Sequence, residues 1–397
     1  MTLLQPPERP NPPHRAANAA ANAGTHDNPA SAVADSALEE LLKAHAAVQD
    51  FSIAHSAGLL SKLLAAGYGG IPAPGSGATL QRWRMLARVA AYDLSLVKLY
   101  EAHVDALAIL AETGARRLAG EGVWAVWCAE IPHARVEIVT PAAAGAKVSV
   151  QGVKDWCSGA AVVNHALVSA WDTEGRPWLV AVDLDDDGIS MEDAGWCAVG
   201  MAATGTMRVR FDTVSATCVG PSNAYLNRPG FWHGGAGIAA CWYGAAAEIA
   251  RCVRAKLPAP ADPHRLAHLG VIDHVLSATA ALLRECAETI DAFPETDAGL
   301  LALRARLQVE HCAATVMHHA GEALGAAPFC RDQHFARLMA DLPVFMRQSH
   351  AQRDRAALGL LVTQAAGVGV DAQATVPAKD GKPAGDVAAF PAPGWKL

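Results

Sequence analysis

The sequence has few charged residues and no excess of positive charge. Only 18% of its 397 residues are charged, and 32 Lys and Arg against 39 Asp and Glu give a formal net charge of −7. Nucleic acids and anionic membrane surfaces attract basic proteins, so this balance speaks against both as partners. We expect a small, neutral or anionic molecule as the ligand instead.

The sequence also lacks paired cysteines and a leader segment. Its nine cysteines are scattered without a CxxC pair, which indicates reduced thiols in a cytoplasmic protein rather than a disulfide framework. The opening residues, MTLLQPPERPNPPHR, have no apolar signal core. The apolar stretch at 234–250 is interrupted by Glu248 and by small residues, which predicts a buried helix rather than a membrane span.

The chain does contain a clear order of helical and extended patterns. Residues 1–35 are rich in Pro, Ala, Asn and Ser and have almost no large apolar side chains, which predicts a disordered arm. From Ser36 to residue 122, Leu and Ala recur at helical spacing, apart from a loop rich in Gly and Pro at 67–77. We expect an N-terminal helical domain over 36–122, with its first helix beginning at Ser36.

Between 123 and 229 the apolar period changes to two. Four runs bounded by Gly, Asp or Pro predict the short strands of an antiparallel unit, at 147–153, 165–171, 177–184 and 206–214. From 230 to 366 the helical period returns and predicts long helices over 238–257, 265–292, 298–325 and 333–365. Residues 367–397 are again rich in Pro, Gly and Ala, which predicts a loose tail.

Four strings, in order, resemble motifs of the acyl-CoA dehydrogenase family over roughly residues 36–365. They are VWCAEIPHA (126–134), GVKDWCSGAAVVNHALV (152–168), VGMAATGTMRVRFDTVSA (199–216) and ALGAAPFCRDQHFARLMADLPVF (323–345). The resemblance implies an α+β fold with an N-terminal helical domain, a small antiparallel β-barrel and a C-terminal four-helix bundle. It also implies FAD, with FMN or a reduced flavin as alternatives, in a cleft between barrel and bundle.

The resemblance assigns cofactor contacts to particular residues. In the family, a Trp of the second motif packs on the isoalloxazine ring and a Thr hydroxyl bonds near flavin N5, and Trp156 and Ser158 take these places. The alternative is that these two residues are only a strand core residue and its turn. The residues implied at the cofactor are Trp127, Cys128, Ala129, Trp156, Cys157, Ser158 and Gly325.

Two elements of the family are missing from this chain. The Arg-x-x-Phe-Gly element that grips the FAD pyrophosphate of a neighbouring subunit has no counterpart in 256–270. The Glu that abstracts the substrate α-proton falls, by its spacing from Asp341, on Ser349. The other family placement of this base, on the helix after the barrel, offers only Glu248. The sequence therefore lacks the general base of thioester dehydrogenation.

The residues at the missing base position indicate different chemistry. His350 precedes Asp354 by four residues, a spacing at which a carboxylate on the same helix face orients an imidazole and raises its pKa. SHAQRD (349–354) resembles the His-x-x-His-Asp string of reduced-flavin-dependent monooxygenases of the same fold, where the His lies at the flavin edge. We place Ser349, His350 and Asp354 at the catalytic position and Glu101 in the substrate pocket. A surface His–Asp pair and an exposed Glu101 are the alternatives.

The favoured function is a flavin-dependent oxidoreductase acting on an acyl or similar organic substrate, with a reduced-flavin-dependent monooxygenase as the first alternative. The second alternative is a non-catalytic scaffold or binding protein. An enzyme that has lost its activity in evolution would also lack the catalytic base and the pyrophosphate contacts. The resemblance also implies a flavin reductase or electron-transfer partner, and a homodimer or homotetramer packed through small-residue helices at 234–250 and 311–327.

The predicted helix at 311–327 contains a cluster of histidines, a residue type that binds metals. His311 and His318 are seven residues apart and share one helix face, and His319 is adjacent. No cysteine or carboxylate completes a tetrahedral set, so we expect solvated or core histidines and no metal.

Overall fold

The computed structural model describes residues 29–46, 50, 52–193 and 195–365. Most of the predicted arm, and the tail from 366 onward, lie outside these residues. The chain divides into two units, one ending at Glu40 and one beginning at Leu41, and every element described after α1 belongs to the second. Helix α1 (Pro29–Ala46) begins seven residues before the Ser36 start that we expected, because a proline is well suited to the first position of a helix.

Three helices precede the sheet: α2 (Ile53–Ala65), α3 (Thr79–Tyr92) and α4 (Leu94–Glu112). Capping side chains start α2 and α4, where Ser52 accepts the His55 N–H and Asp93 accepts the Leu96 N–H. The predicted loop at 67–77 separates α2 from α3. Helix α4 is buried along most of its length, with 14 of its 19 residues in the interior. Its polar side chains are therefore interior groups.

Seven strands follow, and five of them close into a small barrel. The strands are β1 (Trp124–Trp127), β2 (Val136–Ile138), β3 (Lys147–Cys157), β4 (His165–Trp171), β5 (Pro177–Asp183), β6 (Ile189–Glu192) and β7 (Met207–Cys218). The ring runs β4, β2, β3, β7, β5 and back to β4, while β1 adds to β4 and β6 adds to β7. The structure thus has the small barrel that the motifs implied.

The prediction of a purely antiparallel unit is wrong. Strand β4 runs parallel to β1 and to β2. The chain passes through β3 before it reaches β4, and a connection that crosses the barrel in this way brings strands back in the same direction, whereas a hairpin reverses them. Strands β1 and β2 are only four and three residues long. Such short strands show no period in the sequence, which is why they were missed.

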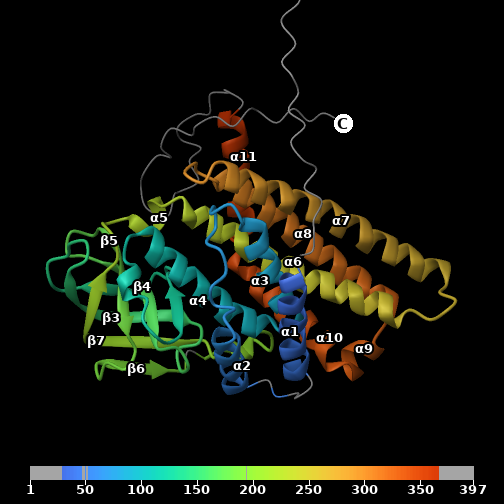
Figure 1. The fold of residues 1–397 in the computed structure, drawn as a ribbon, viewed down its shortest axis with the longest axis horizontal. Helices are drawn as coiled ribbons and strands as arrows, with labels where there is room; N and C mark the ends of the chain where they lie inside the picture. The colour runs from blue at the N-terminus through green and yellow to red at the C-terminus, as the bar shows by residue number, and fades with distance from the viewer. Residues whose placement is uncertain (1–28, 47–49, 51, 194, 366–397) are drawn as a thin grey trace, which may run out of the picture. The chain divides into compact units, whose positions relative to one another are not determined.

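The described residues after β7 are mostly helical. The helices are α5 (Ala224–Asn227), α6 (Gly230–Lys256), α7 (Pro263–Ala292), α8 (Gly299–Leu324), α9 (Ala327–Arg331), α10 (Gln333–Phe345) and α11 (Gln352–Ala365). Figure 1 shows α6, α7 and α8 side by side, with α4 between them and the strands, in agreement with the packing of α6 on α8, of α8 on α7 and of α4 on β1. Helix α6 begins eight residues before the predicted start at 238.

The predicted single helix over 333–365 is wrong. Helix α10 ends at Phe345, a short 3₁₀ turn follows at Met346–Gln348, and α11 begins only at Gln352. Pro343 lies inside α10 and removes a backbone donor near its end. Ala351 has a φ of 49°, which no α-helix contains. The break places Ser349 and His350 in a turn.

One apolar cluster fills the barrel, and a second fixes α4 against it. The barrel interior is filled by alternate side chains of its strands, such as Val150, Val180 and Phe211. A second cluster joins the C-terminal half of α4 to β1, β4 and β5 through residues that include Ile109 and Trp124. Because α4 packs on the barrel on one side and on α6 on the other, its buried polar residues lie between the two.

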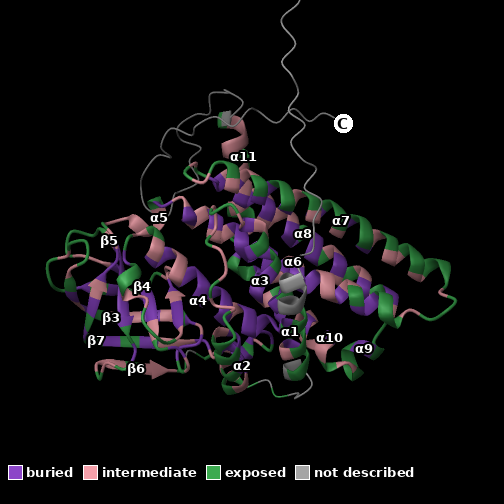
Figure 2. Ribbon diagram, viewed as in Figure 1, coloured by how far each residue is buried: buried purple, intermediate pink, exposed green. Residues whose placement is uncertain are grey.

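Helix α7 differs from the other long helices in its exposure. Among the described helices, α7 is the one whose length and composition would allow it to cross a membrane. A core helix of a soluble protein can meet the same criteria. Only 22% of its most apolar window is buried, and its outer side is exposed in Figure 2. The stretch at 234–250, predicted to be a buried helix rather than a membrane span, lies in α6 and is mostly buried, so that prediction is confirmed.

Candidate active site

The turn at the end of β3 holds an indole ring outside the barrel. Trp156 is 60% exposed, although Lys154 and Cys157 on either side are buried. Its φ of 64° lies in the left-handed region, which a residue of this size rarely adopts. Backbone strain of this kind is concentrated at functional sites. The alternative that Trp156 is a strand core residue is therefore wrong.

A chain of three hydroxyl groups orients Ser158 in the same turn. Thr204 Oγ1 donates to the Met201 carbonyl at 2.7 Å, Thr204 and Thr206 are joined at 2.8 Å, and Thr206 and Ser158 at 2.9 Å. Because Thr204 has already donated its proton, Thr206 donates to Thr204 and Ser158 donates to Thr206. The Ser158 oxygen is therefore left as an acceptor. The Trp127 indole N–H, which donates to the Ser158 carbonyl at 3.1 Å, ties this turn to β1.

The two cysteines of the implied cofactor site are protonated packing residues. Burial raises the pKa of Cys128 to about 11, and a contact with Tyr225 opposes the shift only in part. Burial also raises the pKa of Cys157. Neither thiol is a nucleophile at neutral pH, as the sequence led us to expect. Ala129 follows Cys128 and is exposed.

Helix α4 carries Glu101 and His103 into the interior, where they are only 7% and 5% exposed, so the exposed-face alternative is wrong. Burial raises the pKa of Glu101 even though Lys98 Nζ lies 3.2 Å from its carboxylate. Burial lowers the pKa of His103 to about 4. His103 Nδ1 accepts the Trp124 N–H at 3.1 Å, so this neutral imidazole fastens α4 to β1.

The turn before α11 brings Ser349, His350 and Asp354 together. Asp354 accepts the His350 backbone N–H at 2.9 Å, and its carboxylate lies 3.4 Å from His350 Nδ1. Ser349 Oγ donates to Glu310 of α8 at 2.9 Å. His350 thus precedes the helix and does not share a helix face with Asp354. Asp354 lies in the first turn of α11, where it contacts both the backbone N–H and the imidazole of His350. The His350 side chain is 51% exposed.

Arg306 of α8, which the sequence reasoning missed, connects this turn to other parts of the site. Its guanidinium donates to the Gly235 carbonyl at 2.9 Å and to the Gln348 carbonyl at 3.2 Å. Burial lowers its pKa, and the charges of Asp354, Glu310 and Glu101 oppose the shift. Glu101 and Asp354 therefore lie within electrostatic reach of one cation. The only sequence signal was the four-residue spacing of Arg306 and Glu310, which is common on helix surfaces.

Other candidate residues stand apart from this group. Glu248 accepts from Arg251 at 2.7 Å and contacts His334 at 3.2 Å. It lies fourteen residues along α6 from Gly234, about 20 Å at the helical rise, so it is not a base at the site. Gly325, with a φ of 66°, ends α8. Within the described residues, no hydrogen bond or ion pair joins Trp156 or Ser158 to His350.

The histidine cluster involves a residue that the sequence did not suggest. His319 Nδ1 lies 2.8 Å from Nδ1 of His268 on α7, and the His318 ring packs against His319. Within residues 29–46, 50, 52–193 and 195–365, no group of three His, Cys, Asp or Glu has the arrangement of a metal site.

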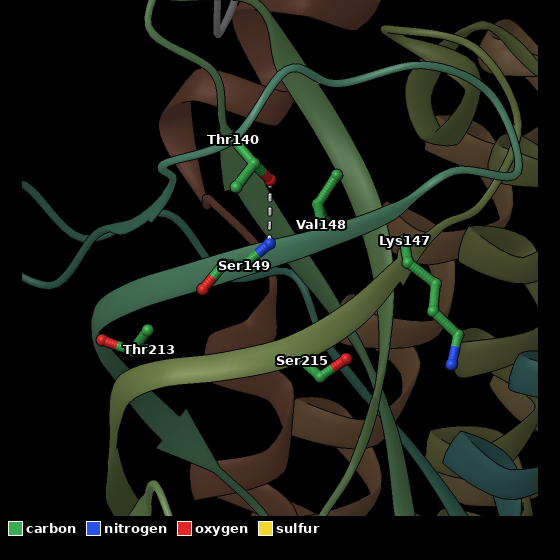
Figure 3. A pocket seen from close by; sticks show the side chains of 6 residues that line it. All are labelled: Thr140, Lys147, Val148, Ser149, Thr213 and Ser215. Atoms are coloured by element: carbon green, nitrogen blue, oxygen red, sulfur yellow. Dashed lines mark hydrogen bonds between the residues drawn. The ribbon is translucent and has the colours of Figure 1, made fainter.

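A separate hollow lies on the barrel at the other end of β3. Its volume is about 270 Å³, and its lining residues are Thr140, Lys147, Val148, Ser149, Thr213 and Ser215 (Figure 3). Eight residues of strand separate Val148 from Trp156, roughly 26 Å at the usual rise. The hollow offers hydroxyl groups and one ammonium but no acid–base pair, so we do not include it in the candidate site.

No protein-family model and no curated protein sequence matches this chain. Solved structures do match its fold. KijD3 in complex with dTDP is 21% identical, with a TM-score of 0.72 over 86% of this chain and 98% of its own. TdsC from Paenibacillus sp. A11-2, solved with FMN and indole, is 18% identical, with a TM-score of 0.67 over 82% and 96%. The nitrososynthase from Micromonospora carbonacea var. africana is 18% identical, with a TM-score of 0.69 over 85% and 97%.

At 18% to 21% identity this likeness establishes the fold. These proteins share the acyl-CoA dehydrogenase-like fold, and the described chain is helical with a small closed five-stranded barrel. The prediction made from the order of the four sequence motifs is confirmed at this level: the chain has the acyl-CoA dehydrogenase-like fold.

Proposed function

We propose that the chain is a flavin-dependent oxidoreductase of the monooxygenase type, which uses reduced flavin and molecular oxygen to oxygenate a small organic substrate. The observation that carries this proposal is the direction of the hydroxyl chain at Ser158. It leaves an acceptor beside the exposed indole of Trp156. A reduced flavin has an N–H at N5 where an oxidised flavin has a bare nitrogen, so the turn suits the reduced form.

The cofactor that fits best is FMN rather than the FAD of the family resemblance. Residues 256–270 offer no Arg-x-x-Phe-Gly element for a pyrophosphate, and both KijD3 and TdsC have been solved with FMN. The residues that would hold the flavin are Trp127, Cys128, Ala129, Trp156, Cys157, Ser158 and Gly325. When bound, the reduced flavin supplies the electrons that activate oxygen.

The polar residues around Arg306 support oxygenation over thioester dehydrogenation. Ser349 stands at the family's base position, and its hydroxyl is committed to Glu310. His350, steadied by Asp354, would hold or move a proton at the flavin edge, and Glu101 would face the substrate. TdsC is a dibenzothiophene monooxygenase and MsuC a methanesulfinate monooxygenase, which supports the same class of reaction. A non-catalytic scaffold has no evident use for these buried polar groups.

Several further expectations belong to the same proposal. The chain would divide into a helical domain at 36–122, a barrel domain at 123–229 and a helical bundle at 230–366. It would work in the cytoplasm as a homodimer or homotetramer. A flavin reductase would supply its cofactor.

The proposal is tested first by flavin binding. We expect the purified chain to bind reduced FMN more tightly than oxidised FMN or FAD. Ser158→Ala removes one hydrogen-bond acceptor for the flavin. The variant should bind reduced FMN about tenfold more weakly, and its affinity for oxidised FMN should not change. Ser149→Ala, near the start of the strand β3 that leads into the Ser158 turn, is the matched control. Failure of every flavin to bind would end the proposal.

A second measurement identifies the reaction. The protein is supplied with reduced FMN, a flavin reductase and ¹⁸O₂, with indole as a probe because TdsC binds it. A monooxygenase places one labelled atom in the product and the other in water. Rapid reoxidation of the flavin with no labelled product, for indole and for a panel of thioesters and aromatic sulfur compounds alike, would contradict oxygenation.

A further inference from the structure

The turn after β3 is fastened to its neighbours by bonds that involve no hydroxyl group. The Gly159 N–H donates to the Thr204 carbonyl at 2.8 Å. The Trp127 indole N–H donates to the Ser158 carbonyl at 3.1 Å. The position of the turn therefore does not depend on the threonine hydroxyl groups beside it, and those groups can be changed without moving its backbone.

The hydroxyl chain that ends at Ser158 starts from a fixed peptide group. The Met201 N–H donates to Asp341 of α10 at 2.6 Å in the interior. The Met201 carbonyl lies 2.7 Å from the Thr204 hydroxyl, and because a carbonyl can only accept, the Thr204 proton must point toward it. Thr204 is 2% exposed, so water does not compete for this bond. The first hydroxyl of the chain thus has a fixed direction.

Thr206 determines the direction of the Ser158 proton. Its hydroxyl lies 2.8 Å from that of Thr204 and 2.9 Å from that of Ser158, and the residue is 9% exposed. A hydroxyl group has a single proton, and that of Thr206 is used at Thr204. The bond between Thr206 and Ser158 therefore needs the Ser158 proton, which is turned inward.

The Ser158 turn is open to solvent on its other side. Ser158 is half-buried, and Trp156, two residues before it, is 60% exposed. A ligand at this turn meets an oxygen whose proton points away from it. Such an oxygen is matched by a donor group of the ligand and is not matched by a bare acceptor.

We propose that Thr206 is a positioning residue that makes the site select reduced over oxidised flavin, because it holds the Ser158 hydroxyl as an acceptor. The inference rests on the proposed function. Thr206 acts through Ser158: the N–H at N5 of reduced flavin is matched by an acceptor, whereas the bare N5 of oxidised flavin needs a donor. Without the Thr206 hydroxyl, the Ser158 proton is free to turn outward and the preference is lost.

The experiment measures the dissociation constants of reduced and oxidised FMN for the full chain under anaerobic conditions. Thr206→Val removes the hydroxyl and keeps nearly the same side-chain shape. This variant should bind reduced FMN about tenfold more weakly and oxidised FMN more tightly than the parent chain. A tenfold change in relative affinity lowers the midpoint potential of bound FMN by about 30 mV for a two-electron couple. Ser158→Ala differs, because it removes the donor together with the acceptor.

Two further variants separate the direction of the chain from its presence. Thr204→Val removes the acceptor that Thr206 uses, so Thr206 donates to Ser158 and the Ser158 proton again turns outward. This variant should change the affinities as Thr206→Val does. Thr206→Ser keeps the hydroxyl and should keep the parent's preference. Thr217→Val is the matched control, since Thr217 is half-buried at the other end of β7.

Neutron diffraction of the chain without flavin provides a measurement independent of binding, and should show the Ser158 deuteron directed at Thr206. A deuteron directed from Thr206 to Ser158 would overturn the inference, as would an equal loss of affinity for both forms of FMN in the two valine variants. An unchanged affinity ratio in chains that bind FMN would overturn the inference and leave the proposed function intact. Failure of every flavin to bind would end both.

Discussion

At the scale of single residues, three buried polar side chains of α4 are stabilised in the interior in different ways. Glu101 keeps a cation beside it, since Lys98 lies one helical turn before it. His103 is held neutral and accepts a backbone N–H. Asp105 Oδ1 has no hydrogen-bond partner among the described residues, but the charges of Asp105 and the buried Arg82 and Arg228 act on one another. All three side chains are therefore held in the interior by groups of the chain itself.

His103 makes folding stability depend on pH. Its pKa is about 4 in the folded chain and about 6.5 when unfolded, so between these values only the unfolded chain binds the proton. Stability from this residue is complete above pH 6.5 and falls by up to about 3 kcal/mol as the pH drops to 4. His103→Gln, which keeps an acceptor for the Trp124 N–H, should flatten this dependence.

The measurement is urea unfolding of both proteins at several pH values between 7 and 4. His233, whose pKa is also lowered by burial, should account for part of the dependence that remains. If the two proteins lose stability in parallel as the pH falls, His103 is protonated in the folded chain and the assignment is wrong.

His350 is expected to affect turnover without affecting folding. If it holds a proton at the flavin edge, His350→Ala should lower turnover by roughly 100-fold, the usual contribution of a positioned acid or base. Asp354→Asn should have a smaller effect, because asparagine can still accept the His350 backbone N–H but orients the imidazole less strongly. Turnover is measured in the flavin-loaded variants. Wild-type turnover in His350→Ala would remove the catalytic role and make Glu101 the next candidate.

At the scale of elements, the contact between α3 and α6 depends on a single glycine. A methyl group at Gly244 would lie 2.2 Å from the Ala87 carbonyl oxygen and 2.6 Å from its Cα. Backbone cannot move aside as a flexible side chain can, so Gly244→Ala should force the helices apart and cost about 2–3 kcal/mol. The free energy of unfolding measures this change.

Gly235 on the same helix is the matched control, because a methyl group there would meet nothing within 4 Å. Gly235→Ala should be neutral or stabilise the chain by up to about 1 kcal/mol, since alanine is the better helix former. Equal effects of the two substitutions would show that α3 and α6 are not in close backbone contact.

The sequence predicted the elements whose patterns are long and local. The predicted strand at 165–171 coincides with β4, and the predicted helices at 265–292 and 298–325 lie within two residues of α7 and α8. Strands of three or four residues have no readable period. The break after α10 was missed because no Gly or Pro marks the turn at 346–351.

The sequence predicted only those residues of the candidate site that belong to a family motif. The turn at Trp156 came from the family resemblance. Arg306 has no motif, because its importance lies in burial and in partners far along the chain. Arg306 bonds to Gly235, 71 residues before it, and to Gln348, 42 residues after it. Nothing in the local sequence distinguishes such residues from an ordinary exposed helix face.

At the scale of the whole molecule, self-association should use α7. The sequence pointed to small-residue helices at 234–250 and 311–327 as interface helices, but α6 uses its small residues to pack against α3 and α8 of the same chain. On α7, Leu266 is 50% exposed and most of the apolar window is not buried. We expect a homodimer or homotetramer in sedimentation at micromolar concentration, and Leu266→Arg should weaken it.

Val139→Arg is the control, since Val139 is 43% exposed and follows β2 on the barrel. This variant should sediment as the parent protein does. A parent chain that is monomeric at micromolar concentration would show that the oligomeric state implied by the family resemblance does not apply to it.

The closure of the barrel also restricts how a partner can bind. Because β4 pairs with both β2 and β5, the described strands with an unpaired side are β1 and β6, each four residues long. A partner that adds its own strand to a sheet needs a longer free edge than this. A reductase or any other protein that docks here must therefore recognise side chains on helices and loops, which makes its specificity a property of surface residues rather than of backbone hydrogen bonding.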